Sequence, residues 1–425
     1  MRAGAWALTA ALVAAFAQPA AGAMQCASRP EVTPPPQIRA VHAESVDIPP
    51  STPPLAVLDT GVGPVGELEA RIHRGANLVK QGAATADPDG HGSAVATIAA
   101  GRIGPAQGVS PTTPIIPITI LGSQGDTTTA RLVDGINRAV RLGARVINVS
   151  LAGPTAMATP ADHRALRRAI FSAVSRRVAV VAPAGNEGSK GLDVPAVYPH
   201  VISVGASDET GSLASYSNFG VGMDLLAPGA SITTAVPEAV CRSGYAIVSG
   251  SSFAAPSVAG AAELLLARQP ELDVAQLTDM LRRSQAPGQR PAWSIERGFG
   301  ILDVARLLAD PVPPRADGEV NDDPSWADRH PAVLAAPARR RVVTGRLTPK
   351  SDPADVFRVR LKQGDRFAAS VSSSGAKLRL SFGTSLRRIG SGEHVRVPRS
   401  GIYYVGVAVR RSAPAGTTYA LSLAR

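Results

Sequence analysis

The sequence predicts an α/β domain, built on a mostly parallel sheet with helices on both faces, followed by an all-β sandwich. Within residues 54–310, short apolar runs alternate with longer segments of helical periodicity, which is the pattern of a parallel sheet covered on both sides. Beyond residue 317, apolar and polar residues alternate as they do in half-buried strands. At 425 residues the chain has room for both units, one of them with a large core.

The N-terminus has the features of an export signal. Met1-Arg2 carries one positive charge, Ala3 to Ala17 is apolar, and the small residues Ala21-Gly22-Ala23 provide a cleavage site. No stretch approaches the ~18 apolar residues that a membrane span requires. We therefore predict a signal peptide at residues 1–23 and a secreted or periplasmic bacterial protein without a transmembrane segment after cleavage. An unstructured alanine-rich tail is the alternative.

Residues 24–53 are expected to form an N-terminal extension, rich in Pro, Ser and Glu, in which Pro34-Pro35-Pro36 predicts extended chain. The domain at residues 54–310 begins with the strand Leu55 to Leu58, which ends at Asp59. The later elements are predicted as a helix from His91 to Ala99, a strand from Ile115 to Leu121 interrupted by Pro117, a helix from Ala130 to Leu142, a strand from Val146 to Leu151, a helix from Asp162 to Arg177, strands from Val178 to Ala182 and from Val201 to Val204, and a helix from Ala254 to Ala267 with Pro256 in its first turn.

A linker is predicted at residues 311–317, where three prolines fall between Pro311 and Arg315. Residues 318–425 then predict a small β-sandwich. The alternating runs are Asp355 to Leu361, Phe367 to Val371, Tyr403 to Val407 and Tyr419 to Leu423.

The positive charge is confined to this last segment. Residues 318–425 contain 19 Lys/Arg and 8 Asp/Glu, whereas residues 1–317 contain 25 of each. The net charge of +11 therefore predicts contact with an anionic cell envelope or another polyanion through residues 318–425, with a merely solvated basic surface as the alternative. Few aromatic residues are interleaved with the basic ones, which argues against a specific nucleic-acid partner.

Four polar residues are predicted at one edge of the parallel sheet. Asp59 follows one strand directly and Asn186 follows another within a few residues, while His91 and Ser252 each open a helix. Ligands of such sheets bind beyond the carboxyl ends of the strands, so these side chains form a candidate site. Ser252 taken alone is more often an ordinary helix N-cap than a catalytic residue.

The four residues suit attack on an amide, which requires a nucleophile, a base, a group that orients the base, and donors for the oxyanion. His91 suits the base because its ordinary pKa is near neutrality, and Asp59 suits the orienting group. The Asn186 side chain and the Ser252 N–H suit the oxyanion. Asp59-Thr60-Gly61 also occurs in aspartic proteases, but their chemistry needs a second carboxylate motif, and the sequence has none.

Four motifs strengthen this hypothesis, namely Ala56 to Val62 around Asp59, His91-Gly92-Ser93 with Val95, Ala184 to Gly188 around Asn186, and Gly250 to Pro256 around Ser252. In content and order they resemble the motifs of the subtilisin-like serine proteases (subtilases, peptidase S8). The resemblance covers about residues 54–310. It implies a serine endopeptidase that acts through an acyl-enzyme, with Asp59, His91 and Ser252 as catalytic triad, Asn186 in the oxyanion hole, and polypeptides as substrates. A catalytically silent surface-binding protein that uses its basic C-terminal domain is the alternative.

The same resemblance implies a set of substrate-binding residues: Ser150, Leu151, Ala152 and Gly153 on the strand that pairs with substrate, Ala184 and Gly185 on the facing wall of the P1 pocket, and Gly122 and Gly125 on the other edge. Their small size predicts a medium or large apolar P1 side chain. No acidic residue in these segments indicates a basic preference, and Glu187 and Asp126 are the only acidic residues nearby.

Some positions depart from the subtilase pattern. Ser251 and Phe253 stand where the serine motif usually has Thr and Met, and Ala94 stands where the histidine motif often has a second His. Residues 101–113 contain no Asp or Asn, so the sequence does not support the calcium loop of many relatives. No cofactor is expected for the chemistry and no metal ligands are assigned, although structural calcium stays allowed.

The extension is too short for the usual folding-assisting propeptide, so either the protein folds without one or the extension packs on as a permanent arm. Cys26 and Cys241 are the only cysteines, and export permits a disulfide between them, with two free thiols as the alternative. In the tail, Glu319 to Asp322, Asp355 to Phe357 and Gly401 to Tyr404 resemble the bacterial pre-peptidase C-terminal domain.

Overall fold

The computed structural model describes residues 24–425 except residues 32, 80–82, 103, 123–124, 156–157, 221, 286–293, 313–333, 336–337, 348–353, 375, 385–386 and 410–416. The predicted signal peptide and most of the predicted linker therefore lie outside the described residues. In the described part, no helix is both long enough and apolar enough to cross a membrane.

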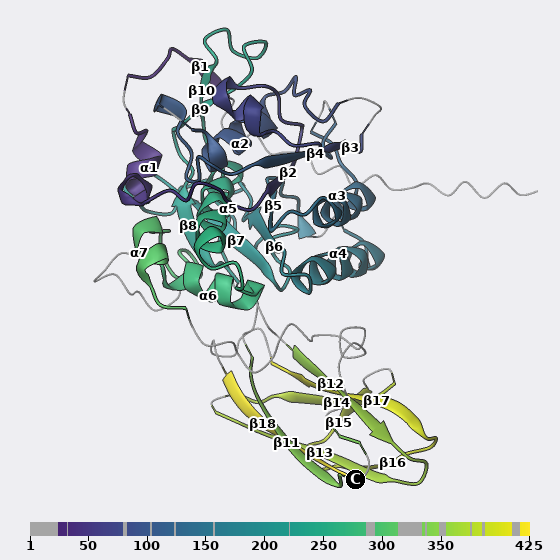
Figure 1. The fold of residues 1–425 in the computed structure, drawn as a ribbon. Helices are drawn as coiled ribbons and strands as arrows, with labels where there is room; N and C mark the ends of the chain where they lie inside the picture. The colour runs from purple at the N-terminus through teal and green to yellow at the C-terminus, as the bar shows by residue number, and fades with distance from the viewer. Residues whose placement is uncertain are drawn as a thin grey trace, which may run out of the picture.

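A seven-stranded parallel sheet forms the centre of the larger unit (Figure 1). In spatial order its strands are β3 (Ala76–Asn77), β4 (Ile115–Thr119), β2 (Leu55–Asp59), β5 (Val146–Val149), β6 (Ala179–Pro183), β7 (Val201–Ser207) and β8 (Leu225–Pro228). Every residue of β2 and of β4 to β8 is buried, as expected of strands covered on both faces. The predicted fold class is confirmed.

Helices cover the two faces of this sheet. They are α1 (Pro36–Ala40), α2 (His91–Ala100), α3 (Thr129–Arg141), α4 (Pro160–Val174), α5 (Ser251–Arg268), α6 (Val274–Arg283) and α7 (Val304–Ala309), with short 3-10 turns η1 (Ala43–Ser45), η2 (Gly66–Arg71) and η3 (Gly104–Ala106). α3 packs beside α4, and α2 packs beside α5, which contacts β5 to β8 (Figure 1). Residues 251–266 of α5 are all buried, because almost all of them are small or apolar, and Glu263 is an acidic exception whose pKa is raised by burial.

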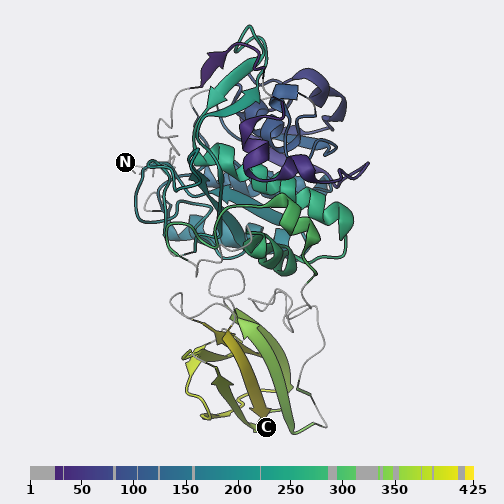
Figure 2. The same ribbon diagram turned by 90° about the vertical axis from the view of Figure 1, so that its left-hand side faces the viewer.

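The N-terminal extension packs onto this unit. β1 (Gln25–Ala27) pairs with β10 (Tyr245–Val248), which in turn pairs with β9 (Ile232–Ala235), and Figure 2 shows β1 alongside this hairpin. Ile38 and Val41 belong to the main apolar core. The prediction of extended chain is wrong at Pro36, which opens α1, since proline fits the first position of a helix, where no N–H is needed.

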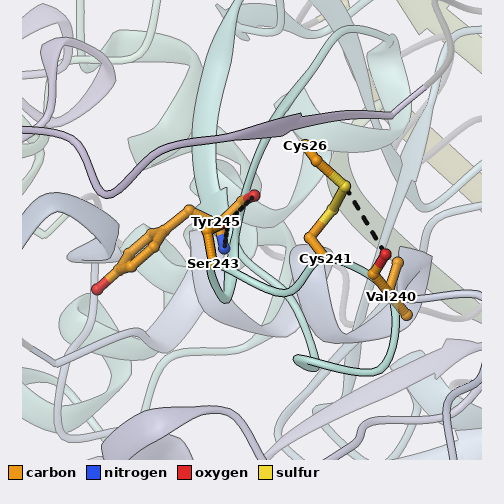
Figure 3. The surroundings of a disulfide bond; sticks show 5 residues. All are labelled: Cys26, Val240, Cys241, Ser243 and Tyr245. Carbon is orange, nitrogen blue, oxygen red and sulfur yellow. Dashed lines mark hydrogen bonds between the residues drawn. A yellow bond between two sulfur atoms is a disulfide. The ribbon is translucent and has the colours of Figure 1, made fainter.

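A disulfide joins the extension to the loop that connects β9 with β10 (Figure 3). Cys26 and Cys241 are bonded, with their Cα atoms 5.4 Å apart and a sequence separation of 215. Among the alternatives left open by the sequence, the bridge is therefore confirmed. The covalent loop that it closes contains all seven strands of the main sheet.

The C-terminal unit contains two antiparallel four-stranded sheets. The first has the order β11 (Arg340–Leu347), β18 (Thr417–Ala424), β13 (Arg366–Ser373), β16 (His394–Arg396), and the second has the order β12 (Ala354–Leu361), β17 (Gly401–Ala408), β14 (Arg379–Gly383), β15 (Arg387–Ile389). Phe367 of the first sheet stacks on Phe382 of the second at 4.4 Å between ring centroids, so the two sheets share one core. This confirms the predicted all-β region.

The two units have separate apolar cores. The larger core draws on residues from Ile38 to Leu307 and the smaller on residues from Leu334 to Leu423. The division of the chain at residues 311–317 stays a proposal, which these separate cores support.

We expect removal of the disulfide to destabilise the protein. Cys26→Ser with Cys241→Ser frees a loop of more than 200 residues in the unfolded state, a loss of about 5 kcal/mol on the loop-entropy model. Denaturant unfolding of the double variant and of the unreduced parent measures the difference in the free energy of unfolding. An unchanged midpoint and slope would show that the bridge contributes nothing to the stability of the extension.

Candidate active site

β2 and α2 place a carboxylate and an imidazole together at the carboxyl edge of the sheet. Asp59 is the last residue of β2 and is fully buried, and His91 is the first residue of α2 and is 7% exposed. His91 Nδ1 lies 2.8 Å from Asp59 Oδ1, and the Thr60 N–H donates to the same oxygen at 2.7 Å. An ionised carboxylate only accepts, so Nδ1 carries the proton and Nε2 of the neutral ring is left as an acceptor.

The surroundings of His91 raise its pKa above the ordinary value. Burial acts in the opposite direction, because it disfavours the charged imidazolium. The charge of Asp59 and its hydrogen bond outweigh burial, with smaller contributions from the charges of Asp89 and Asp87. The carboxylate therefore makes His91 a stronger base than burial alone would leave it.

The first turn of α2 is fixed by Asp87, a residue that the sequence analysis missed. Asp87 Oδ1 accepts from the Thr60 hydroxyl at 2.7 Å, and Asp87 Oδ2 accepts from the Ser93 N–H at 2.8 Å and its hydroxyl at 2.5 Å. The Gly92 N–H donates to Thr60 Oγ1 at 3.0 Å. Asp87 thus links the end of β2 to the start of α2. This link keeps Asp59 and His91 within hydrogen-bonding distance of each other. Its own pKa is raised by burial, against the lowering effect of these hydrogen bonds.

Gly92 is required by the close approach of α2 to β2. A Cβ at this position would lie 1.9 Å from the Gly61 carbonyl oxygen and 3.0 Å from Asp59 Cβ. Any side chain would push His91 away from Asp59. The His-Gly pair is therefore a packing requirement of the imidazole–carboxylate contact.

Ser252 is the second residue of α5, which begins three residues earlier than predicted, so Pro256 lies in the second turn. Proline has no N–H, so the Ser252 carbonyl receives no helical hydrogen bond from position 256. Ser150 supplies the missing donor, because its hydroxyl donates to the Ser252 carbonyl oxygen at 3.0 Å. This bond ties the end of β5 to the residue that carries the candidate nucleophile.

The residue that follows Ser252 contacts the imidazole of His91. The Phe253 ring packs on His91 with 5.0 Å between ring centroids. Ser252 is 6% exposed, and its hydroxyl makes no hydrogen bond to any described residue. The structure thus joins Asp59 and His91 directly, and it brings Phe253, the residue after Ser252, into contact with the imidazole.

Asn186 lies beyond the end of β6 with its amide held in one orientation. Its Oδ1 accepts from the Ser251 N–H at 2.8 Å and lies 2.9 Å from the Ser251 hydroxyl. Because a backbone N–H can only donate, Oδ1 is the atom that faces α5, and the Nδ2 donors point elsewhere. Asn186 is thereby fixed against the residue that precedes Ser252.

Comparison with known proteins agrees with this geometry. The Subtilase family model matches residues 52–300. The chain belongs to the subtilase family. It is 36% identical over 233 residues to Subtilisin Savinase of Lederbergia lenta, across 54% of this chain and 82% of that protein. It is 34% identical over 256 residues to Subtilisin DY of Bacillus licheniformis, across 59% of this chain and 88% of that protein.

Solved structures agree on the fold. A lanthipeptide protease is similar with a TM-score of 0.56 at 23% identity, over 64% of this chain and 92% of that one. The MycP3 protease from the type VII (ESX-3) secretion system is similar with a TM-score of 0.59 at 25% identity, over 67% and 91%. The chain is therefore a subtilisin-like serine endopeptidase, a peptide-bond hydrolase. The resemblance of the tail to the pre-peptidase domain stays a prediction.

The two departures in the subtilase serine motif both make contacts in the site. Ser251 replaces the usual Thr and keeps a hydroxyl, which lies 3.0 Å from the Gly185 carbonyl oxygen as well as near Asn186. Phe253 replaces the usual Met with a ring that packs on His91. The substitutions therefore leave the polar contacts of this subtilase in place and add an aromatic neighbour to the imidazole.

The predicted substrate-binding residues occupy several segments around this centre. Gly153 exchanges backbone hydrogen bonds with Val194 at 3.1 and 2.9 Å, and the Ala184 carbonyl accepts from the Asp193 N–H at 3.0 Å. Leu151, Ala152 and Gly185 are buried, and the Ser150 hydroxyl is committed to Ser252. Contact of these residues with substrate stays a prediction, and for Ser150 it is restricted to the backbone.

The other predicted edge, with Gly122 and Gly125, forms a tight turn. The Gly125 N–H donates to the Gly122 carbonyl at 3.0 Å, and Ser123 and Gln124 between them lie outside the described residues. Gly122 lines a pocket that Thr60 and Asp87 also border. This edge therefore lies on the same side as the first turn of α2.

The part of the chain that the structure describes contains no evident set of metal ligands. There, no group of three or more His, Cys, Asp or Glu side chains is arranged to hold a metal ion. Subtilases need no cofactor for the reaction itself. Structural calcium, which the sequence allows but does not support, is neither shown nor excluded.

The bond between Ser150 and Ser252 can be tested by a double-mutant cycle. Ser150→Ala should cost about 1–3 kcal/mol of stability, because it leaves the buried Ser252 carbonyl without a donor. In a Pro256→Ala background the new N–H can reach that carbonyl, so the same change should cost less. Denaturant unfolding of the four proteins measures the coupling. Equal costs in both backgrounds would show that the two donors do not serve the same oxygen.

Proposed function

We propose that Ser252 is the nucleophile of this endopeptidase, with His91 as general base and then general acid, and Asp59 as the group that orients it. The observation that carries the proposal is the 2.8 Å hydrogen bond between buried Asp59 and His91, beside the helix whose second residue is Ser252. A subtilase needs these three functions, and the hydroxyl of Ser251, the first residue of the same helix, is engaged by the Gly185 carbonyl and Asn186 Oδ1, which leaves Ser252 as the serine available for attack.

The reaction follows from the protonation states. His91 Nε2 takes the proton of the Ser252 hydroxyl as its oxygen attacks the carbonyl carbon of the substrate. The negative charge that forms on the carbonyl oxygen is held by the Ser252 N–H, which is free in the first turn of α5, and by Asn186 Nδ2. His91 then gives its proton to the leaving amine, and water hydrolyses the acyl-enzyme by the same steps. Asp59 keeps Nδ1 protonated throughout.

The cellular setting is also part of the proposal. The substrates are polypeptides, met outside the cytoplasm after removal of residues 1–23. The C-terminal unit contacts anionic envelope or other polyanionic material through its basic edges, of which Arg339 to Arg341 and Arg387-Arg388 are exposed. The alternative of a catalytically silent surface-binding protein is not favoured by any observation.

Ser252→Ala should abolish proteolysis. The loss expected in kcat is roughly a million-fold, the value known for subtilisin, which is a relative of this chain. The measurement is hydrolysis of an unstructured protein by the purified variant. Ser257→Ala, the same change in the same buried helix, is the matched control and should retain activity. Cleavage by the Ser252 variant at the parent rate would disprove the assignment.

A further inference from the structure

Asp193 lies between the two segments predicted to form the walls of the P1 pocket. It follows β6 in the loop toward β7 and is 8% exposed. Its N–H bonds to the Ala184 carbonyl of one wall, while its neighbour Val194 bonds to Gly153 of the other. The Thr155 hydroxyl also donates to the Leu192 carbonyl at 3.3 Å. Through these bonds, the segment that carries Asp193 spans the space between the two walls.

Glu187 brings a second carboxyl group to the same place. It directly follows Asn186, whose N–H donates to Glu187 Oε2 at 3.1 Å. Asn218 Nδ2 donates to the same oxygen at 2.5 Å, and Asn218 Oδ1 accepts from the Glu187 N–H at 3.0 Å. Glu187 is exposed, but these bonds hold its carboxyl group at the loop.

Gly185 permits the approach of Asp193 to the oxyanion segment. A Cβ on Gly185 would lie 2.6 Å from Asp193 Oδ2 and 2.2 Å from Asn218 Nδ2, and its φ of +114° also favours glycine. Asp193 Oδ2 is closed off from solvent and accepts no hydrogen bond from a described donor. The carboxyl group thus lies against the backbone of the residue that precedes Asn186.

Among the described residues, no positively charged side chain compensates the two carboxyl groups. Burial, the charge of Glu187 and a hydrogen bond with Glu187 raise the pKa of Asp193 to about 7, as expected when two carboxyl groups share one proton. The segments packed against Asp193, around Gly153, Ala184 and Asn218, bring no charged side chain. Lys190, in the same loop, is exposed, and it makes no ion pair with either carboxylate among the described residues.

The proposed mechanism implies where the P1 side chain of a bound substrate would lie. The carbonyl group under attack belongs to the P1 residue, and its oxygen is held by Asn186 and the Ser252 N–H. The P1 side chain leaves from the adjacent carbon, next to Ala184 and Gly185. A long side chain that continued along this wall would run toward Asp193, whose N–H bonds to the Ala184 carbonyl.

We propose that Asp193, together with Glu187, forms an anionic floor of the P1 pocket and selects substrates with Lys or Arg at P1. This inference rests on the proposed function of Ser252, His91 and Asn186. It replaces the expectation of an apolar P1 residue, which considered only the two walls. The cation of the substrate supplies the counter-charge that the chain itself lacks, and a buried charge pair of this kind discriminates strongly against an uncharged side chain.

The test compares two peptides that differ only in Lys or Met at P1, side chains of similar length. At pH 8 the full-length protein should have a kcat/KM at least about tenfold higher for Lys than for Met. This ratio should rise from pH 6 to pH 8 as the pair loses its shared proton, and the titration of His91 cancels in the ratio. Asp193→Asn should lower the ratio at least about tenfold, whereas the exposed Glu209→Gln should leave it unchanged.

A wild-type preference for Met, or an equal ratio in wild type and Asp193→Asn, would overturn the inference. Should Asp193→Asn fail to fold, Glu187→Gln should lower the ratio in the same direction, and no change there would also overturn it. Hydrolysis of casein distinguishes failure of the P1 inference from failure of the proposed catalytic function. Casein cleaved by the wild type without a preference for Lys contradicts only the role of Asp193, whereas intact casein contradicts the proposed mechanism as well.

Discussion

The buried hydrogen bond between Asp59 and His91 is the interaction on which the rest of the site depends. A carboxylate without solvent contact is costly unless hydrogen bonds satisfy it; Asp59 Oδ1 receives donors from His91 and from the Thr60 backbone, whereas the buried Oδ2 has no described donor. The bond also fixes the tautomer of the imidazole and raises its pKa. The network of Asp87, Thr60 and Ser93 then holds the start of α2 against the end of β2, so the geometry does not rely on the two side chains alone.

The other half of the site belongs to α5. Pro256 withholds a hydrogen bond from the Ser252 carbonyl, and Ser150 on the neighbouring strand replaces it. Asn186 is anchored to Ser251 at the same helix start. The candidate nucleophile and the candidate oxyanion donor are thus both held in place by contacts at the first turn of one buried helix. Phe253 in that turn packs on His91 and brings the two halves together.

Much of this arrangement is predictable from local sequence. The alternation of short apolar runs with helical segments predicts the parallel sheet, and residues at the ends of strands and starts of helices must then share one edge. The strand from Asp355 to Leu361 is similarly clear, because its buried and exposed positions alternate. β15, with Arg387 and Arg388, has only three residues and no such alternation, so the sequence gives no signal for it.

The residues that the sequence could not reveal depend on contacts between distant segments. Asp193 reaches the proposed P1 pocket only because Val194 pairs with Gly153 and Gly185 lacks a side chain. The start of α5 was misplaced because Pro256 was expected at a helix start, whereas Ser150 makes it tolerable one turn later. Asp87 carried a signal that was overlooked, an acidic side chain shortly before a helix whose free N–H groups need acceptors.

The pH dependence of kcat/KM in the wild type and in Asp59→Asn tests the central claim most directly. His91 acts as a base only when neutral, so its raised pKa should place the acidic limb of the wild-type profile above 6.5, the ordinary value. Loss of the Asp59 charge leaves burial as the largest influence, so the limb of the variant should move to lower pH while the rate falls by roughly four orders of magnitude. Asp134→Asn, a change at an exposed residue of α3, should alter neither the position of the acidic limb nor the rate. An Asp59→Asn profile that coincides with the wild type in both limb and rate would contradict the account.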